Sequence, residues 1–231
     1  MTTTAAGLAL TFDDAYVEQW HALLPLLAEH GARATFFVRD FDRRTDLELQ
    51  QLRELAAAGH EIGCHGFRHR SVKLDYGRDP GRAAEYLEVE VLPAIAAMHE
   101  RGFQPASFAY PHGHSAPAYD RLLLGHFRQL RAVVRGQRWL LPRWLPWIYH
   151  RPGSGARLHR ALGIDLHYGL PDARLASALE HAQATGRVVL LYAHEPGDSG
   201  RPFSLPYSRL AFLFRHARER GLRWATVGEL D

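Results

Sequence analysis

The chain carries acidic and histidine side chains in a spacing that suits a hydrolytic metal site. Asp13 and Asp14 close a tetrapeptide, 11–14 (TFDD), at the end of an apolar run, 7–10, and His65 and His69 come about fifty residues later. Two adjacent carboxylates do not both stay ionised at low cost without a cation nearby. An i, i+4 histidine pair can bind one ion, as it does in helical zinc motifs. One aspartate with two histidines would leave a coordination position open, which is typical of a catalytic metal site.

A further histidine closes a second apolar run late in the chain. His194 follows residues 188–193, a place that suits a proton donor to a leaving group. Asp165 ends the preceding predicted strand and could hold His194 in one tautomer and raise its pKa. Glu195 is a rival partner, although strand alternation would turn it away. A core histidine bonded to the backbone is the plainer alternative for His194.

Plainer readings exist for the first group as well. Asp13 and Asp14 would also serve as a turn or helix cap before Val17. The chain has 15 histidines, so a pair four apart is weak evidence by itself. Cys64 is next to His65, but strand alternation predicts that it packs in the core instead of binding metal. The convergence of several polar clusters on strand ends favours a site over coincidence.

The elements that must position these side chains alternate along the chain. This alternation predicts an α/β protein with a parallel sheet, closed or curled, and right-handed crossovers. The candidate residues follow the carboxyl ends of strands, where barrel enzymes assemble their sites. Because the chain shows no linker and no repeat, we expect one catalytic domain over 1–231. The predicted strands are 7–13, 33–38, 61–64, 106–109, 130–134, 162–166, 187–193 and 224–227, and the predicted helices are 17–30, 46–58, 80–101, 118–124, 172–185 and 205–220.

Composition narrows the choice of partners. The chain has 231 residues, 46% hydrophobic and 23% charged, with a formal net charge of +3. Its basic residues are scattered, so no nucleic-acid partner is predicted. No apolar stretch is long enough for a membrane span, while peripheral membrane contact stays open. The single cysteine excludes an internal disulfide. No secretory signal is evident, so we expect a cytoplasmic protein, unless an export segment has been removed.

Several segments together resemble a known family. Residues 9–14 (ALTFDD), 34–38 (ATFFV) and 59–63 (GHEIG), followed by His65 and His69, resemble motifs of the polysaccharide deacetylases. These are also called NodB-like deacetylases or carbohydrate esterase family four. The likeness runs from Leu8 to Leu230 and implies a distorted (β/α)7-type barrel, the NodB homology domain.

The resemblance also implies an activity, a substrate and a role for each candidate site residue. It implies a metal-dependent hydrolase, with Zn²⁺ as the default ion, that removes an acetyl group from an N-acetylated amino sugar. The substrate would be an N-acetylated carbohydrate or a lipid-linked glycan. The implied roles are a catalytic base, Asp13; three metal ligands, Asp14, His65 and His69; and an acid, His194, tuned by Asp165.

Other positions depart from the family pattern. Ala109 stands where the family's third motif carries an arginine that pairs with the base. With alanine at this position, no arginine of the third motif is evident that could pair with Asp13. His112 replaces an aromatic residue, although its backbone N–H can still serve as an oxyanion donor, and we expect Tyr110 beside it to contact substrate. These departures indicate a divergent member with its own substrate.

Two other functions remain open from the sequence. One is an amide, formamide or ureide hydrolase that acts on a small molecule with the same site. The other is a glycan-binding pseudoenzyme, against which the retained Asp14, His65 and His69 argue. A roomy groove would favour the glycan, and a closed pocket the small substrate.

An unusually long connection, 137–159, is rich in tryptophan and arginine. It contains Trp139, Trp144, Trp147 and Tyr149. Aromatic rings with arginines suit sugar stacking and anionic groups. They also suit an interfacial patch that touches a lipid-linked substrate. A packed lid or a dimer contact is the plainer alternative.

Overall fold

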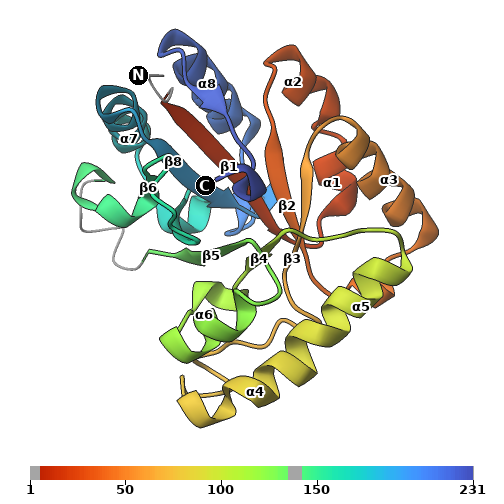
Figure 1. Ribbon diagram of the computed structural model, residues 1–231. Helices are drawn as coiled ribbons and strands as arrows, with labels where there is room; N and C mark the ends of the chain where they lie inside the picture. The colour runs from red at the N-terminus through yellow and green to blue at the C-terminus, as the bar shows by residue number, and fades with distance from the viewer. Residues whose placement is uncertain (1–5, 135–141, 231) are drawn as a thin grey trace.

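Seven parallel strands close into a barrel in the computed structural model, which describes residues 6–134 and 142–230. The last of them pairs back to the first, from Gly7 opposite Val188 to Phe12 opposite Ala193 (Figure 1). This closure confirms the predicted distorted (β/α)7 barrel. The barrel strands are β1 (Gly7–Asp14), β2 (Ala34–Val38), β3 (Glu61–Cys64), β4 (Ser107–Ala109), β5 (Gln129–Val133), β7 (Leu158–Gly163) and β8 (Val188–Ala193).

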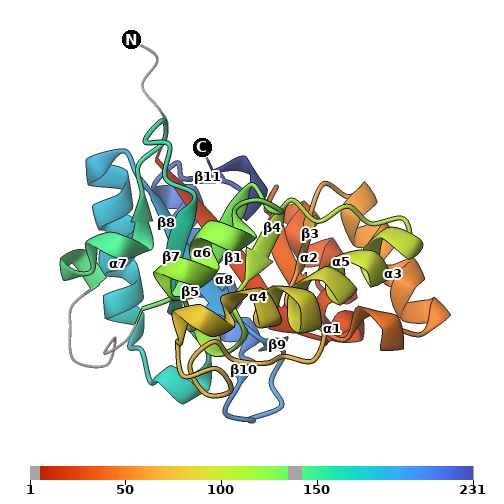
Figure 2. The ribbon, with the colours of Figure 1, turned by 60° about the horizontal axis from the view of Figure 1, so that its bottom comes forward.

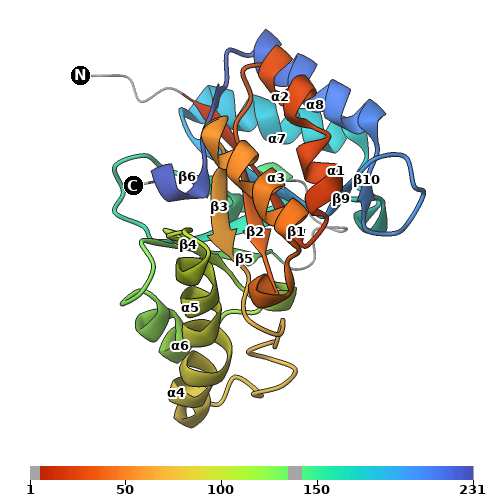
Figure 3. The ribbon, with the colours of Figure 1, turned by 90° about the vertical axis from the view of Figure 1, so that its right-hand side faces the viewer.

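The helices cover the outside of this barrel. Strands that are buried on both faces read as continuous apolar runs, and all six residues of β8 are buried. In Figure 3, α2, α7 and α8 lie along one side of the strands and α4, α5 and α6 along another. The helices are α1 (Val17–His21), α2 (Leu24–Glu29), α3 (Asp46–Ala57), α4 (Ala83–Tyr86), α5 (Leu92–Glu100), α6 (Pro117–Leu123), α7 (Asp172–Thr185) and α8 (Tyr207–Glu219). No helix in the described ranges has both the length and the apolar character that crossing a bilayer requires.

Four short strands complete the structure. β6 (Tyr149–His150) adds to β8 in the antiparallel sense, and β11 (Arg223–Trp224) pairs with the start of β1. β9 (Glu195–Pro196) and β10 (Ser204–Leu205) form a separate pair just after β8. Figure 2 shows this pair outside the barrel strands, in blue.

Two predicted helices are interrupted, and each interruption involves a proline. The predicted helix 17–30 divides into α1 and α2, with Pro25 in the first turn of α2. The predicted helix 80–101 divides into a 3₁₀ turn, η2 (Pro80–Arg82), then α4, a π-helical segment, η3 (Leu87–Val91), and α5, with Pro93 in its first turn. Proline has no N–H to donate, so the regular hydrogen-bond ladder cannot run through it.

Two predicted strands are displaced. The strand expected at 162–166 is β7, which begins at Leu158 and ends at Gly163, so Asp165 lies in the loop beyond it. The strand expected at 224–227 is only the two residues of β11, followed by a 3₁₀ turn, η8 (Val227–Glu229). β11 has only two residues, too few from which to read a period.

The tryptophan-rich connection is only partly described. Trp139 lies outside the described residues. From residue 142 the chain forms two 3₁₀ turns, η5 (Pro142–Trp144) and η6 (Pro146–Ile148), and then β6. Trp144 and Trp147 are 60% and 63% exposed, so neither ring is buried as a packed lid would require.

Candidate active site

A pocket of about 440 Å³ opens at the carboxyl ends of the barrel strands. The strand ends converge there because all seven strands are parallel. Side chains from β1, from the loops after β3 and β4, and from the end of β8 line it: Asp13, Asp14, His65, His69, His112 and His194.

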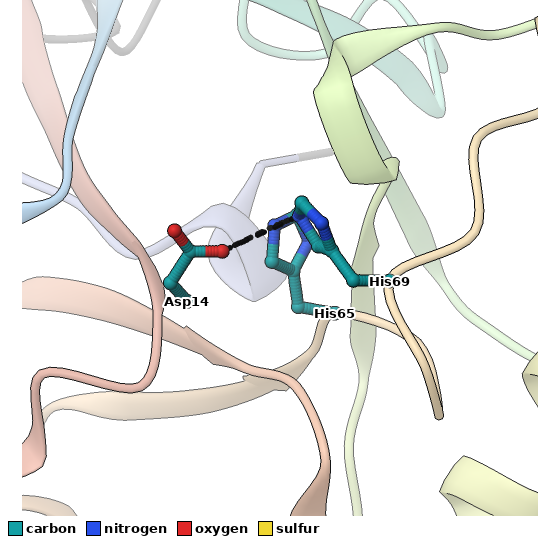
Figure 4. A group of neighbouring side chains, drawn as sticks. All are labelled: Asp14, His65 and His69. Carbon is teal, nitrogen blue, oxygen red and sulfur yellow. Dashed lines mark hydrogen bonds and ion pairs between the residues drawn. The ribbon is translucent and has the colours of Figure 1, made fainter. Parts of the chain in front are cut away.

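Three of these side chains form a compact ligand cluster. The Nε2 atoms of His65 and His69 lie 3.2 Å apart, and Asp14 Oδ1 lies 3.8 Å and 3.3 Å from them, respectively (Figure 4). Ligand atoms at 2.0–2.1 Å from a four-coordinate zinc are about 3.3 Å from one another. The separations therefore fit a small divalent ion.

The chemistry of the donors fits a cation as well. Asp14 Oδ1 is buried and accepts no hydrogen bond within the described part of the chain, and its ion pair with Arg39 Nε, at 3.3 Å, is with a half-exposed side chain. A buried carboxylate oxygen without a hydrogen bond is costly, and a cation in the cluster would offset that cost. His65 Nδ1 contacts the carbonyl of Ala109 at 2.8 Å, so this nitrogen carries the proton and Nε2 presents its lone pair to the cluster. Asp14, His65 and His69 could therefore hold a divalent metal ion.

Burial keeps both imidazoles neutral, the form that binds a metal. It lowers the pKa of His65 well below its usual range. The pKa of His69 falls to about 4, mainly through burial and next through the charge of His112. Neutral imidazoles keep a lone pair at physiological pH, which is the form a metal ligand requires.

A loop, not a helix, brings the two histidines together. β3 ends at Cys64, and the chain turns through Gly66, whose φ is +84°. His69 (φ +60°), Asp14 (+83°) and His112 (+57°) all adopt left-handed backbone conformations that are uncommon for residues other than glycine. Such strain concentrates at functional sites, and three such residues share this pocket.

Glu90 binds the backbone of the histidine loop, residues 65–70. It is fully buried in the π-helical segment η3, and its carboxylate accepts the backbone N–H groups of Arg68 (3.0 Å) and Arg70 (2.9 Å). Its own carbonyl accepts the N–H of Phe67 at 2.9 Å. A Cβ on Gly66 would lie 2.3 Å from Glu90 Oε1, so only glycine fits there. Sequence reasoning missed Glu90, because nothing local connects it to the loop.

Arg131 holds the expected base, Asp13. It is fully buried on β5, and its Nη2 forms an ion pair and hydrogen bond with Asp13 Oδ1. Its guanidinium also lies 5.1 Å from the ring centre of Phe37 and 5.3 Å from that of Tyr192. The expectation that nothing holds Asp13 therefore needs correcting, because the arginine comes from another strand.

Sheet register places Arg131 beside the position at which the resemblance leads us to expect an arginine. Ala109 on β4 and Arg131 on β5 are direct register partners. Both are fully buried, and both lie near Phe37: Ala109 clusters with it, and the Arg131 guanidinium lies 5.1 Å from its ring centre. The only sequence signal was an arginine inside the apolar strand 129–133, where an unpaired charge would be costly.

His194 and Asp165 form the second half of the site. Asp165 is fully buried, and its carboxylate binds His194 Nδ1 at 2.6 Å and the His194 backbone N–H at 3.1 Å. The Nδ1 proton is therefore assigned to this contact, which leaves Nε2 for the pocket. Burial alone would lower the pKa of His194, but the bond and charge of Asp165 outweigh it and raise this pKa. The rival, Glu195, instead accepts a hydrogen bond from Ser199.

The two residues expected to contact substrate lie in different places. His112 lines the pocket, with its ring centre 4.6 Å from that of His69. Tyr110 does not reach the pocket. It is fully buried against Phe108, and its hydroxyl donates to Asp120 at 2.6 Å, so its expected contact with substrate is wrong.

Comparison with known proteins identifies a family and related sequences. A family model described as polysaccharide deacetylase matches residues 1–130. A probable peptidoglycan-N-acetylglucosamine deacetylase from Arthroderma benhamiae is 28% identical over 134 residues. That match covers 57% of this chain but only 28% of the fungal protein.

Solved structures share the fold across nearly the whole chain. A family 4 carbohydrate esterase from Streptomyces lividans, in complex with acetate, has a TM-score of 0.58 at 16% identity, covering 96% of this chain and 92% of its own. A CE4 esterase from Streptococcus mutans has a TM-score of 0.61 at 19% identity, covering 97% and 87%. A family 4 acetyl xylan esterase from Clostridium thermocellum, solved with a cobalt ion, has 0.58 at 17%, covering 96% and 88%. At these identities the likeness shows the fold alone.

The family match covers more than half of this sequence. It includes β1 with its two aspartates, the histidine loop and the segment around His112, and it stops one residue before Arg131. The chain is therefore a member of the polysaccharide deacetylase family.

Proposed function

We propose that this protein is a metal-dependent hydrolase that removes the acetyl group from an N-acetylated amino sugar in a glycan. The observation that carries the proposal is one pocket lined by a buried carboxylate with two imidazoles, a separate carboxylate and an Asp-paired histidine. A divalent ion held by Asp14, His65 and His69 would supply Lewis acidity, which acidifies water and polarises a carbonyl.

Asp13 is suited to act as the general base. Its Oδ2 lies 4.0 Å from His65 Nε2, so the carboxylate is next to the ligand cluster without belonging to it. Arg131 pairs with Oδ1 and thereby orients the carboxylate. In this role Asp13 accepts a proton from the water that attacks the acetamide carbonyl.

His194 is suited to act as the general acid. The contact with Asp165 favours the protonated imidazole, whose Nε2–H can reach the pocket. An amine leaves readily only after it gains a proton, so the acid must act as the C–N bond breaks. The two carboxylates thus have opposite roles. Asp13 accepts a proton from the attacking water, whereas Asp165 stabilises the protonated form of His194.

A backbone donor is available for the developing oxyanion. His112 is the middle residue of a tight 3₁₀ turn, η4 (Pro111–Gly113), and its N–H has no backbone acceptor among the residues that the structure describes. Gly113 follows with φ +66°, and a Cβ there would lie 2.2 Å from Val133. This fixed turn would hold the N–H at the pocket wall, where one donor is typically worth about 3 kcal/mol.

The shape of the site favours a glycan over a small amide. A second hollow of about 480 Å³ shares Gly113 and Val133 with the catalytic pocket. The site therefore continues beyond the reacting groups, as an oligosaccharide requires. A formamide or ureide would need only the first pocket. The complete set of ligands, base and acid also disfavours a pseudoenzyme that only binds glycan.

Titration of zinc into chelated protein tests this proposal. We expect acetate release from N-acetylglucosamine oligosaccharides to appear with about one equivalent of zinc. Asp13→Asn is the matched control, because it should bind zinc and lose about 10²–10⁴-fold in turnover. Zinc-independent acetate release, or near wild-type turnover by Asp13→Asn, would contradict the proposed mechanism.

A further inference from the structure

Three hollows follow one another from the catalytic pocket, at the carboxyl ends of the strands, toward the amino end of β7, where Leu158 and His159 line the third. The second hollow, of about 480 Å³, shares Gly113 and Val133 with the catalytic pocket. The third, of about 390 Å³, shares Trp147 and Arg160 with the second. Because consecutive hollows share their walls, they form one continuous path, which we call the arginine groove. Its length suits several sugar units in sequence instead of a single one.

The arginine groove is lined by positive charge. Arg78 and Arg160 line the second hollow, and Arg151 joins Arg160 in the third. Asp and Glu are absent from the described lining of both hollows. The carboxylates of the site, Asp13 and Asp14, are confined to the catalytic pocket.

These guanidinium groups have no internal ion-pair partner. Within residues 6–134 and 142–230, Arg78, Arg151 and Arg160 form no salt bridge, whereas many other arginines do. Burial raises the pKa of Asp120 and the charge of Arg160 opposes that rise, so these two groups sense each other. Asp120 already accepts the hydroxyl of Tyr110, however, and it offsets at most one of the three charges.

Trp147 adds a stacking surface between the two outer hollows. Its side chain is exposed, at 63%, and it lines both of them. An exposed indole face next to guanidinium groups suits a sugar ring that bears an anionic substituent. A neutral glycan would use the indole but would leave the arginines without a function.

We propose that the arginine groove binds an acidic glycan, so that the substrate is an N-acetylated amino sugar flanked by carboxylate-bearing sugar units. This inference rests on the proposed function for the position of the reacting unit, and it adds the chemical class of the neighbouring units. Guanidinium groups pair with carboxylates through two parallel hydrogen bonds, which fixes the orientation as well as the register of the chain.

Binding to metal-free protein tests the groove without requiring turnover. Isothermal titration would compare a tetrasaccharide of alternating N-acetylglucosamine and glucuronate with a neutral tetrasaccharide of N-acetylglucosamine. We expect the acidic chain to bind about tenfold more tightly in 50 mM salt and to lose this advantage in 500 mM salt. Equal affinity for the two chains at low salt would overturn the proposal.

Matched variants assign the effect to the groove. Arg151→Gln with Arg160→Gln should abolish the preference for the acidic chain and leave the affinity for the neutral chain within about twofold. Arg218→Gln is the control, because Arg218 is an exposed arginine on α8 that lines none of the three hollows. A preference that survives the double substitution, or that Arg218→Gln removes equally, would overturn the proposal.

A third ligand distinguishes an extended site for several carboxylates from a site for a single phosphate group. N-acetylglucosamine 1-phosphate carries its anion directly on the reacting sugar and can occupy only part of the groove. We expect it to bind at least about tenfold more weakly than the acidic tetrasaccharide. Equally tight binding would overturn the extended site in favour of a single phosphate site. Acetate release by zinc-loaded protein, measured separately, reports on the proposed function and not on the groove.

Discussion

At the scale of single residues, the arginine that pairs with Asp13, the proposed base, comes from β5 and not from β4. Arg131 on β5 binds Asp13 beside the position, Ala109, where the family resemblance expects an arginine. The pair is buried, so removing either partner would leave the other as an uncompensated charge in the barrel interior. Two of the Arg131 nitrogens, Nε and Nη1, have no hydrogen-bond partner among the described residues, so Asp13 is its principal anchor.

Exchanging the two positions tests this relation. Arg131→Ala should destabilise the protein by about 3–5 kcal/mol, because it leaves Asp13 buried without a positive partner. Adding Ala109→Arg should recover part of the stability and part of the turnover, since the two positions are register neighbours. Urea denaturation and acetate release measure the two effects. If the double variant recovers neither, the arginine works only from β5.

A second residue-scale prediction concerns pH. The acid requires protonated His194, so turnover should fall as pH rises through the pKa of His194. Asp165 raises that pKa against the effect of burial, and Asp165→Asn removes its charge. Burial then prevails, so the alkaline limb of the kcat–pH profile should move to lower pH.

Surface and spectroscopic controls accompany this pH experiment. Asp172→Asn changes a half-exposed carboxylate that pairs with Arg209 and should leave the alkaline limb in place. The His194 ring signal in an NMR titration should move in the same direction as the kinetic limb. An unchanged profile in Asp165→Asn would show that another group sets the alkaline limb.

At the scale of elements, the π-helical segment and the histidine loop act as a unit. Glu90 satisfies backbone donors of the loop that holds His69. A π-helical turn is rare and frequently marks a functional site. Here it places the Glu90 carboxylate within hydrogen-bond distance of the backbone N–H groups of the loop. The left-handed backbone of His69 needs such support, because strain persists only where the surroundings enforce it.

Metal affinity should therefore depend on Glu90. Glu90→Ala leaves the loop N–H groups unpaired, and we expect zinc to bind about 10–100-fold more weakly, as is typical when groups that orient ligands are lost. Glu90→Gln, which retains one acceptor oxygen, should lose less. The exposed Glu88→Ala on the same segment is the matched control. Competition with a chromophoric chelator gives the affinities, and equal affinity in all three variants would exclude this role.

At the scale of the whole molecule, the proposed ligands come from segments of the barrel that are far apart in the sequence. Asp14 lies on β1, the two histidines follow β3, and the carbonyl that orients His65 lies on β4. An ion held by these groups would link strands that are separate in the unfolded chain. Metal binding should therefore stabilise the entire fold and not only the pocket.

Thermal unfolding checks this coupling. Zinc at about 100 times its Kd should add about 2.7 kcal/mol, which for a chain of this size corresponds to a Tm increase of about 5–10 °C. His69→Ala should abolish most of the increase. His126→Ala, at an exposed position between α6 and β5, is the control and should respond like the wild type. A Tm that zinc leaves unchanged in the wild type would contradict joint binding by the three ligands.

Much of the fold was predictable because local patterns report it. Apolar runs with helical segments between them predicted the parallel barrel, and candidate residues at strand ends predicted where side chains gather. Asp165 remained close to His194 although its strand was misplaced, because both follow strands that are neighbours in the barrel. The boundaries failed where prolines interrupt helices, at Pro25 and Pro93, and where strands are too short to show a period.

By itself, the sequence determined an α/β protein with a parallel sheet and the residues at the carboxyl ends of its strands, since the alternation of strands and helices is encoded locally. The distorted (β/α)7 barrel followed from the family resemblance. Only the tertiary structure decided the partners that no local pattern relates. Arg131 meets Asp13 across 118 positions because of sheet register, and Glu90 reaches the histidine loop through a π-helical turn. The arginine groove likewise exists only where segments distant in sequence come together, because continuity of a surface is a property of packing and not of order along the chain.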